Sequence, residues 1–293
     1  MTSLLLAHGD LVPKSELGSA WETPPAVLAG AGLALLLFGQ AWIRLRLRGR
    51  VDLAGVDRAF LFVAAVVLGT LALVSPLDAI GEEYLISAHM LQHVLIGDVA
   101  PALILLAVAG PLLFFLLPAP LLGRLARATW LRTALRTITR PRVAFAIWAL
   151  VFAVWHVPAV YDYVLTNRWA HDLQHGFFLL AGFLVWYVLI DPARHGTLTR
   201  SGRLGFALAL FAAGEILSMV LIFSFDPLYP AYAAQDERLL GLSPLADQRL
   251  AGIVMMVEQI VTLGTCAALL LLAADRELRS GEEPAQISAG PRP

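Results

Sequence analysis

Seven long apolar stretches dominate this sequence, and they constrain its fold more than any other feature. They lie near residues 25–43, 58–76, 84–107, 143–160, 171–190, 206–225 and 250–273. About 20 apolar residues are enough for a helix to cross the hydrocarbon layer of a membrane. Charged residues make up only 15% of the chain, against roughly 25% in a typical soluble domain. The sequence therefore predicts an all-α fold, a polytopic membrane bundle of seven transmembrane helices.

Basic residues are distributed unevenly between the loops that would join these helices. All but four of the 21 lysines and arginines fall in alternate loops and in the C-terminal segment. The four exceptions are Lys14, Arg168, Arg238 and Arg249. Because cytoplasmic loops carry an excess of Lys and Arg, we expect the N-terminus to lie outside the cell and the C-terminus in the cytoplasm.

The same pattern predicts one membrane domain and no second, soluble domain. It extends over residues 25–275, after an extracytoplasmic N-terminal segment formed by residues 1–24. Residues 276–293 are polar and contain Pro and Gly, a composition typical of disordered segments. We therefore expect these last residues to form a disordered cytoplasmic tail.

The third apolar stretch is longer than one span, because it continues to about Leu117 and each helical residue adds about 1.5 Å. Pro101 and Pro111 are expected to bend it. Residues 108–123 either lie along the membrane interface or dip into the membrane and return. The arginine-rich residues 123–142 form either a solvated loop or a helix on the anionic inner leaflet.

Five of the seven histidines occupy three of the predicted spans. The strings HMLQH and HDLQH contain His89 with His93 and His171 with His175, and WHVP contains His156. Residues four apart share one helical face, with about 5–6 Å between their Cβ atoms, so each pair can offer two imidazoles to one metal ion. Helical rise places all five histidines in the outer half of the predicted bundle. The sequence therefore predicts one outward-facing metal site built by three helices.

Further candidate ligands fall at a similar depth and help to select the metal. Met219, Met255, Met256 and Glu258 are weaker candidates than the histidines. Imidazole suits zinc, copper and iron, whereas thioether sulfur selects Cu(I). Since the single cysteine, Cys266, excludes a paired thiolate site, we expect copper, as Cu(I), with zinc as the alternative.

Three other functions would use the same residues. An intramembrane zinc hydrolase could use the histidines as ligands and Glu258 as the base, although Met90 and Asp172 follow the first histidines where zincins have glutamate. One haem could bind between a histidine of the third span and one of the fifth, which leaves the other histidines unused. A transporter would need polar groups through the full thickness of the membrane, but the inner half is almost wholly apolar.

Three strings carry a family resemblance: HMLQHVLIGDVAPALILL, WHVPAVYDYVL and HDLQHGFFLLAGFLVWY, in this order. They resemble the CtaG family of cytochrome c oxidase assembly factors, the multi-span type associated with caa-type oxidases, over about residues 25–275. The resemblance implies a protein of the bacterial cell membrane that acts as a metallochaperone in building the respiratory chain and is not an enzyme. The family's matching histidines are His89, His93, His156, His171 and His175.

The resemblance also implies the partners. Family members are thought to help deliver copper to the CuB centre of the catalytic subunit of cytochrome c oxidase. We therefore expect this subunit, membrane lipid and an extracytoplasmic copper chaperone as partners, and no nucleic acid. The outer loop formed by residues 226–249 carries no recognisable motif.

Overall fold

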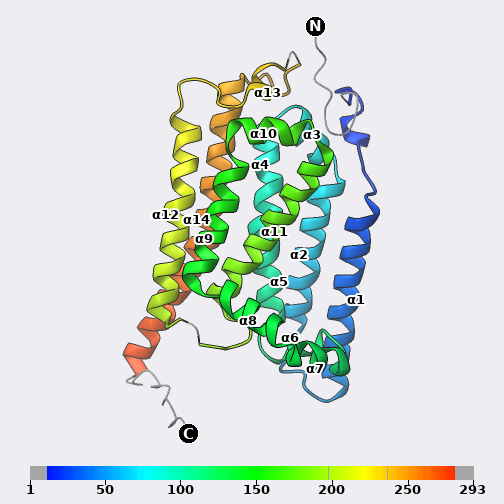
Figure 1. Ribbon diagram of the computed structural model, residues 1–293, viewed down its shortest axis with the longest axis vertical. Helices are drawn as coiled ribbons and strands as arrows, with labels where there is room; N and C mark the ends of the chain where they lie inside the picture. Colours follow the sequence, from blue (N-terminus) through cyan, green and yellow to red (C-terminus); the bar gives the residue numbers. More distant parts are fainter. Residues whose placement is uncertain (1–11, 197, 236, 281–293) are drawn as a thin grey trace.

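In this computed structural model, the described residues are 12–196, 198–235 and 237–280. They form a bundle of long helices that run side by side (Figure 1). Within these ranges the structure contains no β-strand, which confirms the predicted all-α class. The membrane-length elements are α1 (Pro25–Leu47), α2 (Val56–Val74), α4 (Ile86–Val94) continued by η2 (Leu95–Val99) and α5 (Ala100–Val108), α9 (Pro141–Trp155), α11 (Arg168–Ile190), α12 (Arg200–Phe223) and α14 (Pro244–Ser280).

Six of these elements are long and apolar enough to cross a membrane on their own. Helix α9 has 15 residues, and it reaches the length of a span only together with α8 (Thr129–Ile138), from which it is bent by 73°. The predicted spans thus correspond to six separate spans and one bent pair. Helix α1 begins and α14 ends at opposite ends of the bundle (Figure 1), as an odd number of crossings requires.

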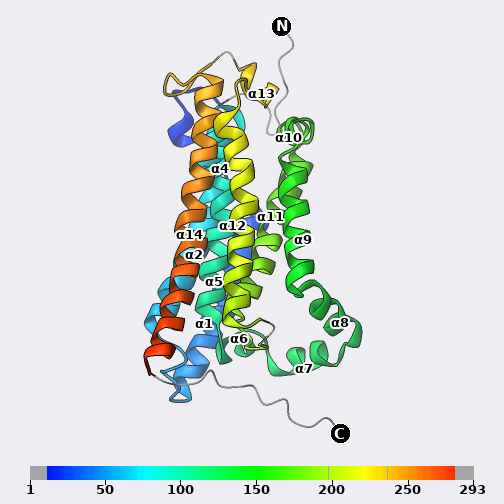
Figure 2. The ribbon, with the colours of Figure 1, turned by 90° about the vertical axis from the view of Figure 1, so that its left-hand side faces the viewer.

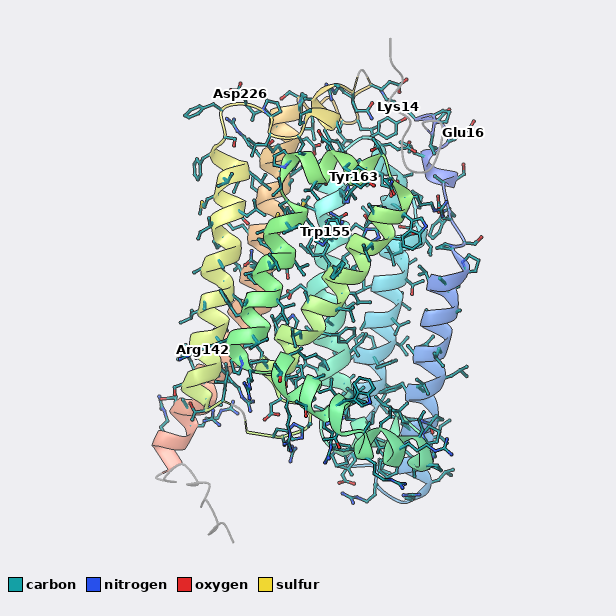
Figure 3. The ribbon with its side chains drawn as sticks, in the orientation of Figure 1. Lys14, Glu16, Arg142, Trp155, Tyr163 and Asp226 are labelled. Carbon is teal, nitrogen blue, oxygen red and sulfur yellow. The ribbon has the colours of Figure 1, made fainter. Side chains whose placement is uncertain are left out.

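Short helices cover the two ends of the bundle. Around the end at which α1 begins, which we call the upper end, lie η1 (Leu17–Ser19), α3 (Leu77–Glu83), α10 (Pro158–Leu165) and α13 (Pro230–Ala233). Around the lower end lie α6 (Pro111–Phe115), α7 (Ala119–Arg127) and α8 (Figure 2). Lys14 and Asp226 lie at the upper end, and Arg142 lies well below them (Figure 3).

The third span continues through Pro101 without a break. Pro101 lies inside a span that continues to Val108, because the π-helical turn η2 immediately precedes it. A wider turn accommodates the missing N–H and the bulk of the proline ring. The chain turns instead at Gly110, whose φ of 81° lies in the left-handed region that glycine tolerates. Pro111 then begins α6, a position that suits proline.

The sequence left two alternatives for each of two regions, residues 108–123 and residues 123–142, and the structure distinguishes between them. Residues 123–142 are mostly helical, within α7, α8 and the start of α9, so the solvated-loop alternative is wrong. Helices α6 and α7 lie across the lower end of the bundle (Figure 2), which favours the interfacial alternative for residues 108–123. Helix α14 continues to Ser280, past residue 276, at which the predicted tail begins. The rest of the predicted tail, residues 281–293, lies outside the described residues.

The packing of the span formed by α4, η2 and α5 against α11 fixes the position of the candidate site. The two spans approach most closely at Gly97 and Gly182, where a Cβ on Gly182 would collide with the carbonyl oxygen of Gly97. The same Cβ would lie 3.1 Å from Cγ of Pro101. Only glycine permits this approach, and it brings the histidine-bearing turns of the two spans together above it.

Candidate metal centre

Four of the five predicted histidines meet in one cluster. Helix α4 supplies His89 and His93, and α11 supplies His171 and His175. One ring nitrogen from each lies within 4.8 Å of the others. The four side chains are between 0% and 8% exposed. The cluster therefore lies inside the bundle, at the upper end of both helices.

Each of the four imidazole rings contacts two of the others. Their centroids are 4.3 Å apart for His89 and His93, 4.1 Å for His171 and His175, and 5.3 Å for each contact between the two helices. A tetrahedral metal with bonds of about 2.0–2.1 Å to nitrogen needs nitrogens about 3.3 Å apart. The four ligand nitrogens lie within 4.8 Å of one another, so the side chains would have to draw closer together to complete a four-nitrogen site.

On two of the rings, those of His89 and His171, the nitrogen that faces away from the cluster has a partner that fixes the tautomer. Nδ1 of His171 lies 2.5 Å from the carboxylate of Glu82, which in its ionised form can only accept a hydrogen bond from the Nδ1–H group. Nδ1 of His89 lies 2.9 Å from the hydroxyl of Tyr232, and this hydroxyl donates its one hydrogen to the carbonyl of Gly81, 2.6 Å away. Both rings therefore carry their hydrogen on Nδ1 and turn the lone pair of Nε2 towards the cluster.

Tyr232 retains its hydroxyl proton at any ordinary pH. Burial raises the pKa of Tyr232 well above its usual value, and the nearby carboxyl groups of Asp247 and Glu82 raise it further. The hydroxyl can therefore donate to Gly81 continuously, and His89 remains the donor in its own contact with Tyr232. The residue has a positioning role behind the candidate ligand.

Helix α4 lacks a local N-terminal cap, and α14 supplies one. The carboxylate of Asp247 accepts from the backbone N–H of Ile86, 2.8 Å away, and of Ser87, 3.2 Å away. It also accepts from the hydroxyl of Ser87 at 2.5 Å. This contact holds the first turn of α4, and hence His89, against a helix more than 150 residues later in the chain.

A roof formed by residues 226–235 and 237–243 covers the cluster at the upper end. The guanidinium of Arg238 donates to the carbonyl of Tyr232, 2.8 Å away, at the end of α13. The side chain of Gln235 donates to the carbonyl of Glu83, 2.5 Å away. The cluster therefore lies at the upper end of the bundle and is closed rather than open, because the roof and its contacts with α3 cover it.

His156, the fifth predicted ligand, lies beside the cluster rather than in it. It ends α9, and its Nδ1 donates to the carbonyl of Phe152, 2.7 Å away. Its Nε2 therefore carries a lone pair, and this buried atom has no hydrogen-bond partner. His156 lines a cavity of about 70 Å³ together with His93.

The weaker candidates are divided between this cavity and the rest of the bundle. Met255 and Glu258 line the cavity, as does Met90. Met219 is 43% exposed on α12, and neither Met219 nor Met256 lines the cavity. The structure therefore brings two of the four weaker candidates near the histidines and leaves the other two apart.

Glu258 has partners other than the clustered histidines. Its carboxyl group accepts from the hydroxyl of Thr262 at 2.9 Å, and the carboxyl group of Asp98 lines the same cavity. The indole N–H of Trp186 donates to Asp98 at 2.5 Å. These contacts hold Glu258 in the cavity and outside the four-histidine group, whereas the zinc-hydrolase alternative requires a base at the metal.

Sequence analysis assigned no role to three residues that support the cluster, Glu82, Tyr232 and Asp247. The two adjacent acids Glu82 and Glu83, at the apolar edge of a predicted span, were the one available signal, since buried acids in membrane segments are usually functional. Tyr232 and Asp247 lie in a segment without a motif, and tertiary contacts alone reveal them.

Comparison with known proteins identifies one family. The model of the family described as cytochrome c oxidase caa3 assembly factor (Caa3_CtaG) matches residues 36–276. The matched range contains all five predicted histidines and the cavity, and it confirms the family resemblance. No curated protein and no solved structure matches the chain.

Proposed function

The chain belongs to the family of cytochrome c oxidase caa3 assembly factors, and we propose that it binds copper in the four-histidine cluster and helps to deliver it to the CuB centre of the catalytic subunit. The observation that carries this proposal is the convergence of four buried imidazoles from two helices. Imidazole nitrogens suit copper, and the family is named for the assembly of an oxidase.

The surroundings of the cluster support a bound cation. Four acids near its upper end, Asp78, Glu82, Glu83 and Asp247, are each at most 6% exposed. A buried positive charge is tolerated where negative charge and hydrogen bonds compensate for lost hydration. Glu82 acts through His171, in the arrangement by which a carboxylate orients a metal-binding imidazole.

The proposal includes an orientation in the membrane. The upper end, where α1 begins, faces the outside of a bacterial cell, and the arginine-rich lower end, where α14 ends, faces the cytoplasm. This orientation follows the excess of basic residues at the lower end. Copper then arrives from an extracytoplasmic donor and crosses the roof, and no step of covalent chemistry is required.

Copper binding by the purified protein tests the proposal. Wild type and the His171→Ala/His175→Ala variant would be loaded with Cu(I) under anaerobic conditions, and retained copper measured after gel filtration. We expect about one copper per chain in the cluster of wild type, and a loss of this copper in the variant, because two of four ligands are removed. Equal copper in both proteins would overturn the proposal.

A matched control separates the cluster from histidine content in general. His195 lies outside the cluster, near the lower end of α11, where its Nδ1 contacts the hydroxyl of Tyr187 at 3.2 Å. His195→Ala is expected to retain as much copper as wild type. In cells that lack the endogenous protein, His195→Ala should restore copper in the oxidase and His171→Ala/His175→Ala should not. Retention of zinc in place of copper would instead favour the zinc alternative.

A further inference from the structure

The cavity beside the cluster contains a second set of donor atoms suited to copper. It is lined by residues of α4, η2, α9, α11, α12 and α14. Its volume of about 70 Å³ exceeds the roughly 10–15 Å³ that one water requires. Of the four clustered histidines, His93 alone lines it, and His156 faces it from the opposite helix, α9. The two rings contact the ring of one side chain, Phe178, at 4.7 and 5.9 Å between centroids.

Hydrogen bonding determines which nitrogen of His93 bears the lone pair. Nε2 of His89 already presents a lone pair, because the hydrogen of that ring lies on Nδ1, towards Tyr232. Nε2 of His93 lies 2.9 Å from it, so Nε2 of His93 must be the donor in this contact. Nδ1 of His93 therefore bears the lone pair, and this buried atom has no hydrogen-bond partner.

His156 presents the matching lone pair from the other side. Its Nδ1 is engaged by the carbonyl of Phe152, the arrangement by which metal-binding histidines are commonly oriented. Its Nε2 is buried and has no partner. A buried nitrogen without a partner costs free energy, and in both His93 and His156 a cation in the cavity would remove this cost.

Two methionines give the cavity softer donor atoms than the imidazole nitrogens of the cluster. Met90 and Met255 are 1% and 3% exposed, and both line the cavity. Thioether sulfur favours Cu(I) over zinc and over Cu(II). The cluster offers imidazole nitrogen only, whereas the cavity offers two imidazoles and two thioethers.

We propose that this cavity is a second copper position, which binds Cu(I) through His156, Met90, Met255 and Nδ1 of His93. The inference rests on the proposed function, since it assumes that copper is the metal of the cluster. His93 is the shared residue, and it binds one copper at a time, because a neutral imidazole has a single lone pair: Nε2 serves the cluster or Nδ1 serves the cavity. When Nδ1 of His93 serves the cavity, the other three histidines hold copper in the cluster. When copper passes from one nitrogen to the other, the ring hydrogen moves in the opposite direction, so the transfer changes neither the protonation state nor the oxidation state.

X-ray absorption spectroscopy of protein loaded with two equivalents of Cu(I) tests the second position. We expect wild type to retain about two copper ions per chain, with sulfur as well as nitrogen in the coordination shell. His156→Ala should retain half as much copper. Met90→Leu/Met255→Leu should lose the sulfur signal, and this substitution conserves side-chain volume, so the fold should persist.

Controls separate this inference from the proposed function. Met219→Leu removes an exposed methionine of α12 and should leave the sulfur signal unchanged. Suppose that the wild-type spectrum shows nitrogen alone in the copper shell and that His171→Ala/His175→Ala loses its copper. This pair of results would overturn the second position and leave the cluster proposal intact. The absence of any retained copper in wild type would overturn both. Thermal unfolding of each variant confirms that a loss of copper does not reflect a loss of fold.

Discussion

The upper and lower halves of the bundle share most of their helices but bury different kinds of side chain. In the upper half the buried residues include the four clustered histidines, Gln92 and Gln174. In the lower half they are almost all apolar, within a core that includes the stacked rings of Phe38 and Phe62, 4.1 Å apart. Buried polar groups in a membrane span are costly, so their confinement to one half marks that half as the functional one.

The contrast is sharpest along α11, which passes through both halves. Its upper turns contain His171 and His175 of the cluster. In the middle of the helix, Gly182 contacts the π-helical turn η2. The lower turns contain Val188 and Leu189, which belong to the apolar core. Substitutions along this single helix can therefore separate metal binding from stability. The upper half should determine copper affinity, and the lower half should determine the free energy of unfolding.

Leu189→Ala is expected to produce the largest loss of stability. The side chain is 2% exposed in the apolar core, and its truncation leaves a cavity that costs about 2–5 kcal/mol. Copper binding by the folded protein should stay at the wild-type level, because no contact of the cluster changes. Thermal unfolding in detergent and retained copper would be measured together, with Leu180→Ala, at a position 66% exposed on the same helix, as the control. A loss of copper in folded Leu189→Ala would contradict the separation of the two halves.

Gly182→Ala should affect both properties, because it acts where the halves join. The added Cβ collides with the carbonyl oxygen of Gly97, which forces α11 and η2 apart. Overpacking of this kind costs about 1–3 kcal/mol, and it should also weaken copper binding by displacing His175 from His93. Both the unfolding temperature and the copper affinity are the readouts.

Gly176→Ala provides the control on the same helix. A Cβ at this position meets nothing within 4 Å, and replacing a mid-helix glycine by alanine typically stabilises a helix by about 0.5–1 kcal/mol. We expect unchanged copper binding and a small gain in stability. Equal behaviour of the two glycine variants would show that the contact between Gly97 and Gly182 does not position the cluster.

Local patterns in the sequence were sufficient to predict the spans and the paired histidines. Span length follows from bilayer thickness, and the spacing of His171 and His175 places both rings on one face whatever their surroundings. Depth along the membrane was also predictable, because helical rise is nearly constant. These quantities depend on one helix at a time.

Lateral position was not predictable in the same way. His156 lines one cavity with His93, but position along a helix does not reveal which helices surround a residue, and His156 lies beside the cluster rather than within it. Pro101 shows a similar limit, since the π-helical turn that accommodates it depends on packing against α11. The sequence did not predict the roof either, because the contact between Tyr232 and His89 depends on the tertiary fold.

Tyr232→Phe is expected to have the smallest effect on stability and a specific effect on copper. The substitution keeps the buried ring and removes the hydroxyl that accepts from His89 and donates to Gly81. His89 then loses the contact that fixes its tautomer, and the loss of such a partner typically weakens metal binding about 10–100-fold, which corresponds to about 1.4–2.8 kcal/mol. Tyr163→Phe, at a position 59% exposed on α10, is the matched control. Competition with a chromophoric Cu(I) chelator measures both affinities, and an unchanged value in Tyr232→Phe would show that the roof covers the cluster without orienting its ligands.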